Sequence, residues 1–447
     1  MSSTLMPTEE LMAQETVAPW MAAPPVYDNE SNLPDWYQKF REESWKRFVN
    51  TADPKRTDEN WRFADLKKSK FSELLPAAQV EDEAALIDRS EKSRLTDCAA
   101  HYVFANNRLI DSDANGLPEG AICLPFGEAI EKHGDLVREH FMKEDRSLGG
   151  DKFAALHGSA ALSGLFVYFP KGVVCEKPIQ VHHYVGGNQQ VIFPHTLVVA
   201  EDNAQVSVID MFETIAEEEQ TLVIGVVDLV AKNGANLQYV ALQDESDHGA
   251  RHVQINSTRA GRDARTKSAF INLGASWIRN ESINRMLEEG ADCQIFSANL
   301  ANGVQEYDQR TLQTHEAQHT TSDLLFKNAL YDEARTIFSG LIQVQPGAHH
   351  TDSFQTCRNM LGSDKAEANA MPGLEIDADQ VKCSHGSTSG QISDEEIFYL
   401  QARGIPAEQA RQMISLGFLN ESISRLGGEE LKEFLFRRVE KKFANLL

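Results

Sequence analysis

From Phe166 onward, the hydrophobic positions of the chain fall into short runs rich in β-branched and aromatic residues, separated by polar turns. Runs of this kind are typical of β-strands. Helical runs long enough to connect parallel strands in βαβ units are missing between them. The pattern therefore predicts a mainly β central region. Its clearest strands are expected at residues 166–169, 179–181, 196–199, 206–209 and 222–229.

A turn signature recurs in this region, in which a small or polar residue is followed by alanine and then by a strand. The four clearest copies end at alanines that lie 31, 29 and 27 residues apart, and looser copies follow. A repeat of this length, with a strand and a turn in each copy, indicates a solenoid. We predict a parallel β-helix, with an antiparallel sandwich as the alternative. The copies are Asn203-Ala204, Gly234-Ala235, Asp263-Ala264, Gly290-Ala291, Glu333-Ala334 and Gly347-Ala348.

The region before the repeats has helical rather than alternating periodicity. Aromatic residues between Trp36 and Phe48 recur at roughly helical spacing among charged residues. Residues 60–66 and 71–75 continue this mostly helical pattern, His101 to Ile110 is a possible strand, and a further helix is expected from Glu128 to Lys143. We therefore predict a helical N-terminal module.

Three short amphipathic helices are predicted after the repeats. Ser393 and Glu396 have the spacing of a capping box, Pro406 opens a second helix that ends near Gly417, and a third begins at Glu429. Such helices at the end of a solenoid serve as a cap, the commoner use, or as a docking surface. The expected organisation is a disordered segment 1–30, a helical domain 31–150, a β-helix 151–392 and a helical domain 393–447.

Charge and cysteine content narrow the function. The chain has 67 acidic against 43 basic residues and a formal charge of −24, which disfavours nucleic acid and anionic membranes as partners. We find no apolar run of membrane-spanning length and no targeting signal, and we expect a cytoplasmic protein. Six widely spaced cysteines without a Cys-x-x-Cys pair predict neither a disulfide framework nor a self-contained zinc knuckle.

His315 to His319 matches the His-Glu-x-x-His pattern of zinc proteases. That chemistry needs a helix, on which both histidines reach one zinc ion. On the strand that we predict here, they would stand roughly 13 Å apart, too far to share a metal. We therefore expect no zinc and no peptidase activity from this pair. A zinc-dependent hydrolase using it, or a polysaccharide-active β-helix enzyme, is the alternative to a non-enzymatic function.

Cys383 and His385 are two positions apart and therefore lie on one face of an extended strand. A thiol and an imidazole placed in this way can hold a soft transition metal or form a reactive thiolate. Cys357 precedes Cys383 by 26 residues, about one coil of the repeat. We therefore predict that Cys357 shares a site with Cys383 and His385.

Residues 300–425 closely resemble the SufB/SufD family of iron–sulfur cluster assembly proteins, and its SufD branch in particular. The segments that carry the resemblance are His319-Thr320-Thr321-Ser322-Asp323, Cys357-Arg358-Asn359-Met360-Leu361, Pro372-Gly373-Leu374-Glu375-Ile376, Val381-Lys382-Cys383-Ser384-His385-Gly386 and Phe398-Tyr399-Leu400-Gln401-Ala402-Arg403-Gly404-Ile405.

The resemblance implies a central right-handed parallel β-helix between helical domains. It also implies a non-catalytic scaffold that pairs with a SufB-like subunit through the β-helix and binds the SufC-like ATPase through its last helices, with a homodimer when isolated. It implicates His385, with Cys383 beside it, in forming a transient iron–sulfur cluster shared with SufB, and we expect both residues to be metal ligands there; no cofactor is expected to bind tightly to this chain alone. Cys357 departs from the SufD pattern, because it falls where SufB-type members carry their important cysteine.

Overall fold

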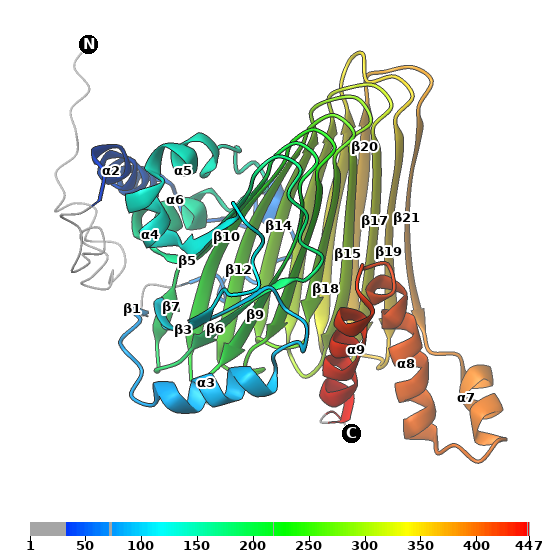
Figure 1. Cartoon of the computed structure of the whole chain (residues 1–447). Coiled ribbons are helices and arrows are strands. Elements are labelled where there is room, and N and C mark those ends of the chain that lie inside the picture. Colours follow the sequence, from blue (N-terminus) through cyan, green and yellow to red (C-terminus); the bar gives the residue numbers. More distant parts are fainter. Residues whose placement is uncertain (1–32, 71–73, 218, 445, 447) are drawn as a thin grey trace, which may run out of the picture.

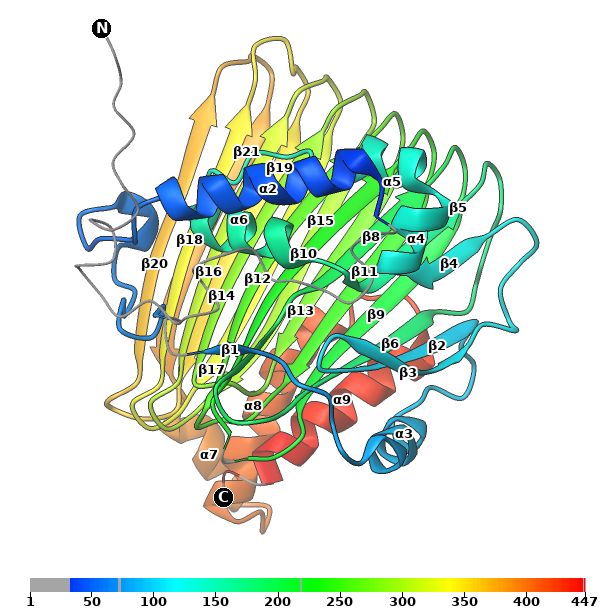
Figure 2. The same ribbon diagram turned by 90° about the vertical axis from the view of Figure 1, so that its left-hand side faces the viewer.

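The structure is a computed structural model that describes residues 33–70, 74–217, 219–444 and 446 (Figures 1 and 2). The predicted disordered segment 1–30 lies outside the described residues. No described helix is long and apolar enough to cross a membrane.

The centre of the molecule is a parallel β-solenoid built from two facing sheets (Figure 1). From β8 onward, consecutive strands alternate between the sheets, and each pairs in parallel with the strand two further along the chain. This confirms the predicted solenoid and excludes the antiparallel sandwich. The first sheet, called sheet A, contains β4 (Ile122–Pro125), β5 (Ser163–Phe169), β8 (Pro194–Ala200), β10 (Thr221–Ala231), β12 (Ala250–Ala260), β14 (Trp277–Met286), β16 (Glu306–His315), β18 (Arg335–Val344) and β20 (Glu367–Ile376), with the short β1 (Leu75–Pro76) and β7 (Gln190–Ile192) beside β10.

The second sheet, called sheet B, runs from β3 at one end to β21 at the other. Its strands are β2 (Ala100–Ala105), β3 (Arg108–Asp113), β6 (Ile179–Val185), β9 (Gln205–Thr214), β11 (Asn236–Asp244), β13 (Arg265–Asn272), β15 (Asp292–Ala301), β17 (Thr321–Leu330), β19 (Asp352–Leu361) and β21 (Lys382–Gln391).

The four clearest copies of the turn signature mark one corner of the solenoid, where a strand of sheet A leads into the next strand of sheet B, whereas the looser copy at Glu333-Ala334 lies at the opposite corner. Asn203, Gly234, Asp263 and Gly290 have φ values of 58°, 68°, 54° and 77°, a region that glycine, asparagine and aspartate tolerate best. The alanine after each of them is at most 1% exposed. The corner therefore needs a left-handed residue followed by a small buried one, which is why the pair recurs in four consecutive coils; His319-Thr320 takes its place in the next coil.

The N-terminal region closes one end of the solenoid and covers one side of sheet A (Figure 2). β2 extends sheet B by pairing with β6, and β4 extends sheet A by pairing with β5. The described helices here are α2 (Asp35–Asn50), the 3-10 helix η3 (Glu59–Trp61), α3 (Glu83–Lys92), α4 (Phe126–Lys132), α5 (Gly134–His140) and α6 (Asp151–Ala160).

Three expectations for this region are wrong. The possible strand from His101 to Ile110 is a hairpin, because Asn106 and Asn107 take the positive φ values of a tight turn between β2 and β3. The helix expected from Glu128 to Lys143 is two helices that break at His133. Residues 60–66 form turns around η3 rather than a helix, and part of 71–75 lies outside the described residues.

The C-terminal helices are α7 (Asp394–Gln401), α8 (Ala407–Ile423) and α9 (Glu429–Ala444). α8 continues through Gly417, so the expected end of this helix is wrong. Ser393 is the N-cap residue of α7, as predicted, but its side chain makes no capping hydrogen bond. Buried side chains of α8 and α9, including Leu419 and Leu435, pack on the outer face of sheet B. Both helices cover a flank of the solenoid, and α7 projects beyond them (Figure 1).

Candidate functional site

The last coil of the solenoid, formed by β20 and β21, has one neighbour on each strand. β20 pairs with β18 and β21 pairs with β19, and among the described residues nothing pairs with their outer edges. Most side chains of β21 are exposed, whereas alternate side chains of β19 are buried in the lumen of the solenoid. The lumen therefore opens to its surroundings at this end.

Cys383 and His385 lie at this opening. They are opposite Ser353 and Gln355 of β19, both of which are buried and belong to the lumen-facing set. The Cys383 side chain is partly covered, and burial together with the nearby Asp352 carboxylate raises the pKa of its thiol. The His385 side chain is exposed. The pair thus offers a protonated thiol and an accessible imidazole on one face of an edge strand.

Cys357 belongs to the same lumen-facing set but not to the same position. Facing residues in β19 and β21 are 30 residues apart, as Asp352 and Lys382 are, so Cys357 is opposite Ser387. Our assumption that one coil here spans 26 residues, the distance from Cys357 to Cys383, is therefore wrong. By strand geometry, Cys357 is about 13 Å along the strand from the position opposite Cys383, but only about 7 Å from that opposite His385. The shared site stays a prediction.

The surroundings of Cys357 are those of a core residue. Its side chain is fully buried, and burial raises the pKa of the thiol to about 12. Its sulfur lies 3.7 Å from Nδ2 of Asn328 and 3.7 Å from Oδ1 of Asn359. At neutral pH, the thiol is therefore protonated and held by two asparagines.

The two histidines of the His-Glu-x-x-His segment are in different environments. His315 ends β16 with both ring nitrogens in hydrogen-bond contact, 2.8 Å from Oγ1 of Thr320 and 3.0 Å from Oγ of Ser322. His319 lies in the turn with a φ of 57°, and its exposed ring stacks on His350. Our expectation that one strand carries both residues is wrong, because the chain turns immediately after His315.

A row of asparagines runs along the lumen from coil to coil on sheet B, and we did not predict it from the sequence. Asn272, Asn299, Asn328 and Asn359 occupy equivalent positions on β13, β15, β17 and β19, and each is linked to the next by an amide hydrogen bond of 2.6 Å. Nδ2 of Asn359 then donates to Oγ of Ser389 on β21, at 3.1 Å. Asparagines recurring once per coil were the signal in the sequence. The row connects the interior to the open last coil.

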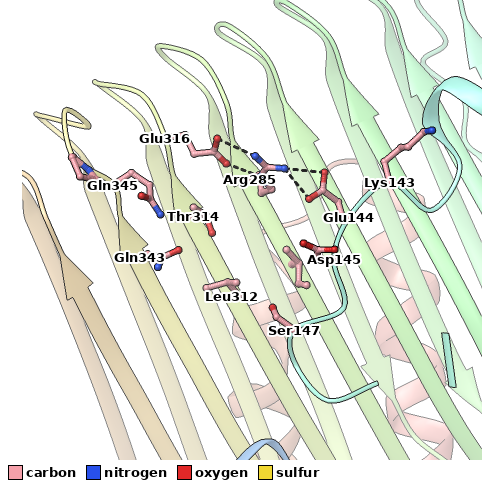
Figure 3. A pocket seen from close by; sticks show the side chains of 12 residues that line it. Lys143, Glu144, Asp145, Ser147, Arg285, Leu312, Thr314, Glu316, Gln343 and Gln345 are labelled. Atoms are coloured by element: carbon pink, nitrogen blue, oxygen red, sulfur yellow. Dashed lines mark hydrogen bonds and ion pairs between the residues drawn. The ribbon is translucent and has the colours of Figure 1, made fainter. Parts of the chain in front are cut away.

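A hollow on the outer face of sheet A contains an arginine that is paired with two glutamates (Figure 3). Arg285 donates to both carboxylate oxygens of Glu316, at 2.6 and 3.0 Å, and to Glu144 on its other side, at 3.0 Å. These hydrogen bonds, that to Glu316 foremost, raise the pKa of Arg285. The arginine and its two carboxylates thus satisfy each other, and we assign no chemistry to this hollow.

Comparison with known proteins gives matches along almost the whole chain. Residues 183–418 match the family described as "SUF system FeS cluster assembly, SufBD core domain", and residues 29–181 match "SufBD protein N-terminal region". The iron–sulfur cluster assembly protein SufD of Bacillus subtilis is 25% identical, over 93% of this chain and 96% of that protein. SufD of Escherichia coli is 29% identical, over 93% and 97%, and SufB of B. subtilis is 25% identical over 86% and 85%.

Proposed function

The chain belongs to the SufBD family of iron–sulfur cluster assembly proteins, and from this premise we propose that it is a cytoplasmic, non-catalytic scaffold subunit of the SufD type. It pairs with a SufB-type subunit through the open end of the solenoid, and the two chains together assemble a transient cluster. The observation that carries the proposal is the position of Cys383 and His385 on the edge strand β21.

A second chain is needed because this chain offers too few ligands at the open end to hold a cluster. Iron–sulfur clusters are held by about four ligands, mostly thiolates. Of the six cysteines, only Cys383 lies on an edge strand of the last coil, and His385 adds a borderline nitrogen donor. An unpaired edge is a ready template for strands of another chain. A partner that extends β20 and β21 would bring its own ligands to this pair; a second copy of the same chain could use the edge in isolation.

The protonation state of Cys383 fits a site that forms only in the complex. Because burial raises the pKa of its thiol, the free chain carries a thiol rather than a thiolate there. Iron binding displaces the proton, since a thiol deprotonates when it coordinates a metal ion. We assign Cys357 as a third donor. It lies on β19, the strand next to β21, two positions along from the residue opposite His385. The cluster is cargo of the scaffold and not its resident cofactor.

We place the docking surface for the SufC-type ATPase on α7. Phe398 and Tyr399 are 71% and 56% exposed, which is unusual for large hydrophobic side chains. α8 and α9 bury their apolar faces against sheet B and so anchor this surface to the scaffold.

The decisive experiment is anaerobic co-expression with SufB and SufC proteins, followed by measurement of iron and sulfide in the purified complex. We expect His385→Ala to lose most of the iron while the three subunits still co-purify. Ser384→Ala is the matched control, because Ser384 is an exposed residue on the same strand with its side chain on the opposite face. Unchanged iron content in His385→Ala would contradict the assignment of this site.

A further inference from the structure

A group of three potential metal ligands lies at the closed end of the solenoid. Glu91 is in the last turn of α3, His101 is in β2 and Asp111 is in β3. One donor atom of each residue lies within 4.8 Å of the other two. No other group of three or more such donors occurs in the described part of the chain. Three separate elements therefore bring an imidazole and two carboxylates to one point.

His101 is the residue that most needs an explanation. Its side chain is fully buried, and neither ring nitrogen has a hydrogen-bond partner among the described residues. Leaving a buried polar group without a partner costs roughly 1–3 kcal/mol, so native structures seldom do it. Its Nδ1 lies 3.4 Å from Oε1 of Glu91, which directs the ring toward the carboxylates. A bound cation would satisfy the nitrogen that the protein leaves open.

The local charge suits a cation. Arg94 is the nearby positive charge, and it is held by Asp113 at 2.8 Å and by Cys98 at 3.2 Å, with a longer contact of 3.3 Å to Glu91. Together with Asp111 beside Glu91 and His101, three carboxylates stand against one guanidinium here, so the local charge is net negative.

We propose that Glu91, His101 and Asp111 form a binding site for a divalent first-row transition-metal ion. One imidazole and two carboxylates are the donors that zinc, manganese and ferrous iron accept. Glu91 is exposed, which gives an ion access from solvent. β2 and β21 lie toward opposite ends of sheet B, so this site is separate from Cys383 and His385 and does not depend on the proposed scaffold function.

The test uses the full-length, chelator-treated chain and zinc ions as the probe. We expect titration calorimetry to give one zinc per chain, and thermal denaturation to give a higher Tm with zinc, since a ligand that binds the folded state stabilises it. Glu91→Gln and Asp111→Asn should each weaken binding at least tenfold, because even altering a ligand's outer shell costs roughly 10- to 100-fold. When cobalt ions replace zinc, the visible absorption spectrum should be that of cobalt with nitrogen and oxygen ligands.

Two controls locate the site. Asp88→Asn removes a carboxylate on the same helix whose partner is Lys92, and His319→Gln removes an exposed histidine elsewhere; both should leave zinc binding unchanged. Absence of stoichiometric zinc, or binding that survives both Glu91→Gln and Asp111→Asn, would overturn the proposal. If these variants do not fold, the anomalous diffraction signal of zinc in crystals of the unaltered chain replaces them as the test. A zinc peak at these three residues would support the proposal, and a peak elsewhere would overturn it.

Discussion

Cys357 lies directly opposite Ser387 in the register of β19 and β21, two positions beyond the pair formed by Gln355 and His385. The thiol is therefore nearer to the imidazole of the proposed assembly site than to its other thiol. It is also fully buried, whereas His385 is exposed. Because Cys357 is buried and displaced from Cys383 along the strand, substitutions of Cys357, Cys383 and His385 can be compared one at a time.

We expect Cys357→Ala to have two effects. Removing a buried sulfur atom should lower the free energy of unfolding by about 1 kcal/mol. If Cys357 is a donor behind His385, the variant should also lower the iron content of the anaerobic complex, but less than Cys383→Ala does. Chemical denaturation and iron analysis of the same preparations measure both. Full iron content in Cys357→Ala would return this cysteine to the core.

Replacing the exposed aromatic side chains of α7 should abolish ATPase docking. In Phe398→Ser/Tyr399→Ser, we expect SufC to be lost from the co-purified complex, whereas the SufB-type subunit stays. Deleting residues 393–447 is a poorer test, because it would uncover the sheet face under Leu419 and Leu435. Val304→Ser is the control, since Val304 is 68% exposed and far from α7 in sequence. Retention of SufC by the double variant would refute the placement.

Interrupting the asparagine row should destabilise the solenoid. Asn328 accepts from Asn299 and Gln309 and donates to Asn359, so Asn328→Ala leaves buried amide groups without partners. We expect a loss of about 3 kcal/mol in the free energy of unfolding. Asn50→Ala, at an exposed position in α2, should change it by less than about 0.5 kcal/mol. Equal stability of both variants in urea denaturation would show that the row carries no net energy.

His315 should make stability depend on pH. Burial lowers the pKa of His315 to about 4, whereas its ordinary value is 6.5. Below pH 6.5, the unfolded chain binds a proton that the folded chain does not, so stability is full above pH 6.5 and falls as the pH drops toward 4. The difference amounts to about 3 kcal/mol. We expect His315→Gln to make this part of the profile less steep, while other buried histidines such as His157 keep part of the slope, measured by urea denaturation at pH 7 and pH 4.5; identical profiles would contradict it.

The His-Glu-x-x-His segment should give neither zinc binding nor peptidase activity. His315 uses both ring nitrogens inside the protein, and His319 lies in a turn at the surface. Zinc content of the full-length chain should therefore be the same in His315→Ala as in the unaltered protein. A stoichiometric zinc that disappears in His315→Ala would reverse this conclusion.

The solenoid was predictable because its corner imposes a local requirement that repeats. A left-handed residue followed by a buried alanine leaves a visible trace, as at Asp263-Ala264. The register of the last coils was not predictable from the same trace, because coil length varies: partners are 29 residues apart between β15 and β17 but 31 between β17 and β19. Loops outside the sheets absorb the difference and leave no periodic signal.

The candidate sites also differ in whether a local pattern in the sequence could predict them. Placing Cys383 and His385 on one face needed only the period of a strand, and the structure has them there. The cluster of Glu91, His101 and Asp111 was out of reach, because it depends on how α3 packs against a hairpin. The turn of that hairpin did leave a sign, since Asn106-Asn107 suits a tight two-residue connection.

The two ends of the solenoid differ in length as well as in cover. The last strands at the open end, β20 and β21, have 10 residues each, whereas β4 and β3 at the other end have 4 and 6. Short terminal strands discourage edge-to-edge pairing, and long ones invite it. Only the open end is therefore suited to joining another chain. Under the proposed function, two chains that join at their open ends would leave no second open end free, so assembly would stop at a pair and would not continue into a fibre.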